Sequence, residues 1–182
     1  CPDVINAQEG FFDVESVWPK LEQALRQAIS NLVAMRETEG SNIYGDFIKR
    51  ADLIAEKLAV IEERSPQVVE EYQTRLSDRI NELLAKHNQV IEPERLLQEV
   101  AIFADRTSIT EEIVRLKSHI KQFRLIIDAD QPVGRKLDFL IQEFNREANT
   151  IASKANDYTL AQVVVEIKAE IEKIREQIQN IE

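Results

Sequence analysis

Residues 134–155 read GRKLDFLIQEFNREANTIASKA, and this stretch decides the fold. Its apolar side chains recur at intervals of three and four positions, which places them on one face of an α-helix. They are Leu137, Leu140, Ile141, Phe144, Ala148 and Ile151. The remaining positions hold mostly acids, bases and amides. The stretch therefore predicts an amphipathic helix that packs one face on a core and leaves a chemically mixed face outside it.

The same spacing recurs along the chain, and glycine or proline separates the segments that carry it. Only 4 glycines and 5 prolines occur among 182 residues, a composition typical of long helices. The breaks fall at residues 40–45, 66, 93 and 132–134. We therefore expect helices over residues 16–38, 44–64, 66–86, a short one after 93, 110–127, 134–155, and from about 157 to the C-terminus.

The predicted fold is all-α, with long antiparallel helices in a bundle or hairpin array. We divide the chain into residues 1–15, a linker or extended segment, residues 16–104, a long-helix hairpin region, and residues 105–182, a C-terminal helical region. The last helix carries a heptad seam of Leu160, Val164, Ile167, Ile171, Ile174, Ile178 and Ile181. Such a seam packs inside a bundle or pairs with a second copy as a coiled coil, and the spacing leaves both open.

Charge and cysteine content limit the classes of function. The net charge is −10, which argues against a non-specific nucleic-acid binder, because basic contacts to phosphate supply most of that affinity. A local basic patch or a metal-dependent site remains compatible with this charge. The single cysteine excludes a disulfide framework or a zinc finger. A cytoplasmic location, which we predict, fits this cysteine content. No signal peptide is visible, and no uncharged apolar run approaches membrane-spanning length.

Two of the predicted helices carry acids and bases on one flank. Glu112, Arg115 and His119 lie at i, i+3 and i+7 beside an apolar stripe. Glu143 and Glu147 lie one turn apart, a spacing at which two carboxylates bind Mg²⁺ or Mn²⁺ or position a water. Charged flanks are also common as solvated ion pairs, so spacing alone leaves a structural role open.

Four segments of the chain resemble the signatures of the YicC/YloC family of bacterial endoribonucleases. They are RETEG at residues 36–40, ADRTSITEEIVRLKSHIKQF at 104–123, the stretch at 134–155, and VVVEIKAEIEKIREQIQNIE at 163–182. The resemblance covers essentially the whole chain. It implies a bacterial, soluble, oligomeric protein that cleaves RNA internally with help from a divalent metal. It also implies a separate N-terminal domain, which has no counterpart in this chain.

Within these signatures we assign roles by chemistry. Catalysis is assigned to His119, Glu112 and Glu147, with His119 acting as a ligand or a general acid. A Mn²⁺ or Mg²⁺ ion is assigned to Glu143, Glu147 and Glu112. RNA contact is assigned to basic and amide side chains, which suit phosphate groups: Arg106, Arg115, Arg135, Lys136, Arg146, Asn149 and Lys154.

The function we expect is therefore metal-dependent hydrolysis of RNA, with this chain as the C-terminal helical part of the enzyme. RNA, further copies of the chain and the N-terminal domain are the expected partners. The alternative is a non-catalytic helical module that assembles subunits or clamps RNA, or a regulatory adaptor. The heptad seam and the acidic charge favour that alternative, whereas the carboxylates inside the signatures favour the enzyme.

Overall fold

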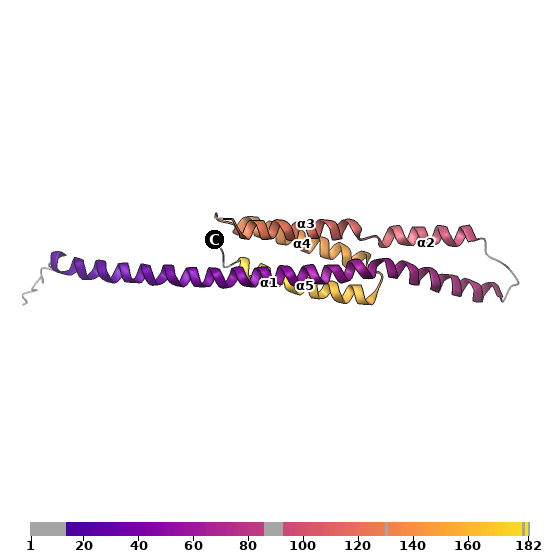
Figure 1. Cartoon of the computed structure of the whole chain (residues 1–182), viewed down its shortest axis with the longest axis horizontal. Coiled ribbons are helices and arrows are strands. Elements are labelled where there is room, and N and C mark those ends of the chain that lie inside the picture. The colour runs from indigo at the N-terminus through magenta and orange to yellow at the C-terminus, as the bar shows by residue number, and fades with distance from the viewer. Residues whose placement is uncertain (1–13, 86–92, 130, 180, 182) are drawn as a thin grey trace, which may run out of the picture. The chain divides into compact units, whose positions relative to one another are not determined.

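The computed structural model of the chain describes residues 14–85, 93–129, 131–179 and 181. It is all-α, as predicted, and no strand occurs within those ranges. The helices are α1 (Val14–Ala85), α2 (Pro93–Thr107), α3 (Thr110–Ile127), α4 (Gly134–Lys154) and α5 (Tyr158–Ile178) (Figure 1). The extended segment expected over residues 1–15 lies outside the described residues apart from its last two, which belong to α1.

The chain divides into two units, residues 1–43 and residues 44–182, and α1 contributes to both. In the second unit, α4 packs along α3 and along α5 (Figure 1). The part of α1 that begins at Tyr44 completes a four-helix bundle, because ion pairs join it to both α3 and α5.

These ion pairs also fix the helix directions. Three of them join α1 to α5, and the α5 number falls as the α1 number rises: Arg50 with Glu170, Lys57 with Glu166, and Arg64 with Asp157. Two more join α1 to α3 in the same sense: Asp52 with Arg124, and Glu62 with Lys117. Because α1 runs antiparallel to both neighbours, the bundle alternates up and down, which confirms the predicted antiparallel arrangement.

The core of the bundle is built from the apolar seams of its four helices. Every residue of the stripe predicted in residues 134–155 is buried, from Leu137 to Ile151. The rings of Phe47 and Phe123 meet edge to face at 5.4 Å between centroids, and Phe144 lies 5.9 Å from Phe123. These rings tie α1, α3 and α4 together at the centre of the bundle.

The heptad seam of α5 packs inside this bundle. Leu160, Val164, Ile167, Ile171, Ile174 and Ile178 are all buried against the rest of the chain. Of the two alternatives left open by the spacing, intramolecular packing is therefore the one the structure adopts. A second copy has no access to this seam while the bundle is closed.

The predicted helix breaks at residues 40–45 and at residue 66 are wrong, because α1 runs through all of them. A glycine inside a helix costs only about 1 kcal/mol relative to alanine, too little to end a helix stabilised by packing. Pro66 removes one backbone hydrogen bond, at a cost of about 3 kcal/mol. Ile61 and Val68 are buried on either side of it, and their burial offsets that cost.

The seam predicted in residues 16–38 behaves differently, although the helix itself is present as part of α1. Leu21, Leu25, Leu32 and Met35 are each at least half exposed. This part of α1 therefore leaves its apolar seam largely exposed in the part of the chain that the structure describes. Further along the chain, α2 is held against α1 by the stacked rings of Tyr72 and Phe103, whose centroids are 3.7 Å apart.

Replacing Gly45 by alanine should stabilise the second unit. Gly45 lies inside α1 with no atom within 4 Å of the position a Cβ would take, so the methyl group meets no obstacle. The substitution should raise the free energy of unfolding by about 0.5–1 kcal/mol, because alanine loses less backbone entropy in a helix. Urea denaturation would measure it. An unchanged or lower stability would mean that the helix is interrupted at this point in solution.

Asp157 both caps α5 and anchors α1. One carboxylate oxygen accepts a hydrogen bond from the backbone N–H of Leu160 at 2.9 Å, and the other accepts one from Arg64 at 2.8 Å. The hydrogen bond from Arg64 lowers the pKa of Asp157, with the Leu160 N–H acting in the same direction against the opposing effect of burial. The folded state is therefore stabilised by the ionised form of this carboxyl.

Asp157→Ala should lower the free energy of unfolding by about 1–2 kcal/mol, because the cap and the Arg64 contact are both lost. Asp157→Asn keeps an acceptor for the cap and should lose less at pH 7. The folded-state pKa is lowered, so the advantage of the wild type over Asp157→Asn should shrink as the pH falls below about 4, the usual unfolded value, and vanish once the pH has fallen through the folded-state pKa. Denaturation of all three proteins between pH 3 and pH 7 checks this, and a pH-independent difference would contradict it.

Candidate metal centre

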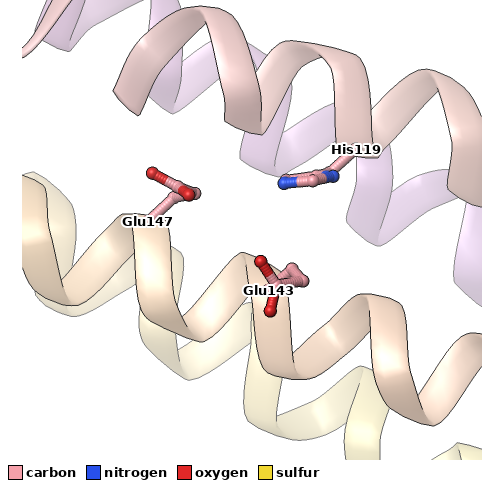
Figure 2. A group of neighbouring side chains, drawn as sticks. All are labelled: His119, Glu143 and Glu147. Carbon is pink, nitrogen blue, oxygen red and sulfur yellow. The ribbon is translucent and has the colours of Figure 1, made fainter. Parts of the chain in front are cut away.

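His119 of α3 and Glu143 and Glu147 of α4 form a compact group on one side of the bundle. Each residue offers one ligand atom, and the three atoms lie within 4.8 Å of one another. Figure 2 shows the three side chains entering the space between the two helices, the imidazole from one helix and both carboxylates from the other. The antiparallel packing of α3 on α4 thus brings together residues from the two signature segments.

The local sequence explains why these side chains meet. Glu143 and Glu147 are four residues apart, so both project from the same flank of α4. Glu147 lies at the border of the apolar stripe and is only 4% exposed, whereas Glu143 and His119 are half-buried. The imidazole lies beside the ring of Phe144, with centroids 6.3 Å apart. The core thereby fixes the positions from which the three side chains project.

Several polar atoms of this group are buried without a partner. Neither ring nitrogen of His119 has a hydrogen-bond partner among the described residues, and the same is true of one carboxylate oxygen of Glu147. Buried polar atoms without partners are uncommon in folded proteins. An imidazole and two carboxylates are a donor set that suits a divalent transition-metal cation. The residues present therefore fit a metal site.

Arg115 links this group to a second buried carboxylate. Its guanidinium lies 3.0 Å from Glu147, through Nε, and 3.0 Å from Glu112, through Nη2. Lys154 reaches the same oxygen of Glu112 at 3.0 Å from the end of α4. The other oxygen of Glu112 is buried without a partner among the described residues. Two cations and two buried carboxylates therefore extend the site along the α3–α4 interface.

The pKa values of two members reflect these contacts. Burial raises the pKa of Glu112, but the hydrogen bond from Lys154, the local backbone and the charge of Arg115 together hold it below its usual value. The hydrogen bond to Glu147 is the largest contribution that raises the pKa of Arg115. Glu112 thus remains ionised despite its burial, and Arg115 stays charged.

Of the residues assigned from sequence, some lie next to the group of His119, Glu143 and Glu147, and others lie farther from it. Glu112 lies beside the three-residue group, bound to Arg115 and Lys154, rather than within it. Arg146 lies 3.7 Å from Glu143 and is largely exposed. Arg135 and Lys136 are in the first turn of α4, two turns before Glu143, and Arg106 lies in the last turn of α2. Asn149 is exposed, on the flank of α4 opposite to Glu147.

The flank of α4 that carries Asn149 holds a shallow depression that was not predicted. It is lined by Gln142, Asn145, Arg146, Asn149, Thr150 and Arg175. Arg175 comes from α5, and nothing in the sequence could have paired it with the amides of α4 before the packing of the two helices was known. Arg146 belongs both to this depression and to the surroundings of Glu143.

Comparison with known proteins identifies the family. Residues 61–182 match the family model described as Endoribonuclease YicC-like, C-terminal. The chain is 50% identical over 181 residues to a protein of Clostridioides difficile named probable endoribonuclease YicC, and 36% identical to one of the same name from Haemophilus influenzae. The alignments cover the whole chain but 61% of each relative.

None of the described helices is both long and apolar enough to cross a membrane. The family match extends over two thirds of the chain and includes α3, α4 and α5, with all three residues of the candidate metal centre. This chain therefore belongs to the YicC-like endoribonuclease family and carries its C-terminal domain.

Proposed function

We propose that the protein is an endoribonuclease that hydrolyses RNA with the help of a divalent cation bound by His119, Glu143 and Glu147. One observation carries the proposal: three potential ligand atoms lie within 4.8 Å of one another and include buried atoms without hydrogen-bond partners. The names of the relatives, probable endoribonuclease YicC, supply the reaction class. The metal dependence rests on the site alone.

The donor set favours Mn²⁺ over Mg²⁺, the two cations expected from sequence. Imidazole nitrogen is a borderline ligand that suits transition metals, whereas Mg²⁺ selects oxygen. A bound divalent cation supplies charge neutralisation at a phosphate and lowers the pKa of a coordinated water. Arg115 holds one oxygen of Glu147 and leaves the other without a partner among the described residues, which orients that carboxylate toward the group.

The cations around the site have the chemistry to bind an RNA strand. Arg146 is largely exposed next to Glu143, so its guanidinium reaches solvent close to the carboxylates. Arg115 and Lys154 are about 40% exposed and can neutralise a phosphate that approaches the α3–α4 interface. Asn149, Gln142 and Thr150 add hydrogen-bonding groups in the depression beside Arg146. The three cations, Arg146, Arg115 and Lys154, place positive charge next to the site, although the chain as a whole is acidic.

We further propose that the substrate is RNA, that the protein assembles into a homo-oligomer, and that it is located in the cytoplasm. The chain spans 61% of the length of its relatives, so the cleavage test below uses the protein extended to their full length. The second candidate is an RNA-clamping, subunit-assembling or adaptor module with catalysis elsewhere. The net charge of −10 is the observation that favours it.

The metal site can be tested by direct binding. Glu147→Gln and His119→Gln should each weaken Mn²⁺ binding by at least about tenfold, because each removes a ligand or alters its charge. Asp138→Asn removes the same charge from an exposed position of α4 outside the group and serves as the matched control. Electron paramagnetic resonance of Mn²⁺ or titration calorimetry measures the affinity. Equal affinity in all four proteins would eliminate this site.

RNA binding can be tested separately from metal binding. Arg146→Gln should weaken the binding of single-stranded RNA several-fold and reduce the dependence of log affinity on log salt by about one phosphate contact. Arg26→Gln makes the same charge change on an exposed residue of the first unit, far from α4 in the sequence, and should have a smaller effect. Fluorescence anisotropy at several salt concentrations gives both values. Identical salt slopes would remove Arg146 from the RNA interface.

Cleavage of a structured RNA with and without Mn²⁺ distinguishes the two candidate functions. We expect cleavage by the protein extended to the full length of its relatives, and loss of that cleavage on Glu147→Gln. Retention of cleavage by this variant would overturn the proposed centre. If this chain alone binds RNA without cutting it, while Glu147→Gln leaves the longer protein active, the clamping module is the better description.

A further inference from the structure

The first unit carries an apolar stripe with nothing packed on it among the described residues. Eight large side chains of α1 between positions 17 and 35 are 41–57% exposed, and they include the only tryptophan of the chain. We call this set the α1 stripe: Val17, Trp18, Leu21, Leu25, Ile29, Leu32, Val33 and Met35. The next apolar seam of the same helix, from Phe47 to Ile61, is completely buried.

The spacing of the α1 stripe is that of a packing surface. Trp18, Leu21, Leu25, Leu32 and Met35 follow steps of three and four or their sum, which aligns them along one face of the helix. The opposite face holds side chains such as Gln23, Gln27, Ser30 and Glu37. A single exposed leucine needs no explanation, but eight aligned apolar side chains in a chain of net charge −10 indicate a surface that is covered in the working protein.

The size of the α1 stripe matches a stable interface. Half of the surface at eight large apolar residues amounts to roughly 800 Å², about the area that one partner contributes to a standard protein interface. A helix without such packing is marginal in water, because most helical stability in proteins comes from burial of the apolar face. The first unit therefore gains its stability from whatever covers this face.

The comparisons indicate the occupant. The C-terminal family model begins at residue 61, so the α1 stripe lies outside the matched domain, and the first unit ends at residue 43. The matched model is described as the C-terminal one of its family, and 39% of the length of each relative lies outside the alignment. That portion corresponds to roughly 110 residues, the size of a typical domain.

We propose that the α1 stripe is the docking face for the N-terminal part that these relatives carry, so that residues 17–35 complete the core of that part rather than of the bundle. The proposal is independent of the metal centre and of RNA cleavage. The partner is then part of the same polypeptide, and it presents an apolar surface of about the same area to the α1 stripe. A second copy of the chain, pairing stripe to stripe as a coiled coil, is the competing occupant that the test must separate.

Hydrogen exchange on the protein extended to the full length of its relatives tests the proposal. Amides of residues 17–35 should exchange at least about 100-fold more slowly in the longer protein than in this chain, because docking suppresses local opening of the helix. The difference should not depend on protein concentration. Equal exchange in the two proteins would overturn the proposal, and so would protection in this chain alone that rises with concentration, which indicates a second copy.

A pair of variants keeps the test specific to the α1 stripe. Leu25→Glu places a charge in the stripe and should restore fast exchange over residues 17–35 in the longer protein. Gln23→Glu adds the same charge two positions away on the opposite face and should leave the protection unchanged. If Leu25→Glu fails to fold, the wild-type comparison still decides, with acrylamide quenching of Trp18 in this chain as an independent measure of its exposure. Loss of protection in both variants would contradict a stripe-specific contact.

Discussion

The antiparallel packing of α3 on α4 is the contact on which the rest of the candidate site depends. The seam of α4 buries Leu137, Phe144 and Ile151 against its neighbours, and this burial sets the rotation of the helix. Once that rotation is fixed, Glu143 and Glu147 face His119 across the interface. The geometry of this group therefore follows from hydrophobic packing, and a shift of either helix by one turn would separate the imidazole from the carboxylates.

The electrostatics of the site follow from its place at the edge of the core. Glu112 and Glu147 are both nearly buried, and Arg115 satisfies an oxygen of each. A buried carboxylate without such a partner is costly, so Arg115 and Lys154 stabilise the folded state while they leave further oxygens unpaired. The chain as a whole is acidic, but this interface places opposite charges side by side, which is why net charge alone is a poor guide to what the site can bind.

The helical class, the antiparallel bundle and the buried seams of residues 44–64, 134–155 and the last helix were predictable, because periodic burial leaves a strong pattern in sequence. Helix boundaries within α1 were not predictable from Gly40, Gly45 and Pro66, since packing outweighs their local cost. The spacing in sequence shows that both signature helices carry acids and bases on one flank. How the two helices are aligned with one another, however, depends on long-range packing. For that reason the sequence offered Glu112 as a ligand and left His119 as either a ligand or a general acid, while the structure brings His119 to the two carboxylates and places Glu112 beside them.

The position of the candidate centre along its helices has a dynamic consequence. His119 lies near the middle of α3, and Glu143 and Glu147 lie near the middle of α4. Fraying of a helix begins at its ends and reaches the middle only when the element opens as a whole. The three side chains of the candidate centre are thus held in place by the fold itself. Because all three side chains project from helices, a motion that changes the spacing of the group must move α3 relative to α4 as whole elements.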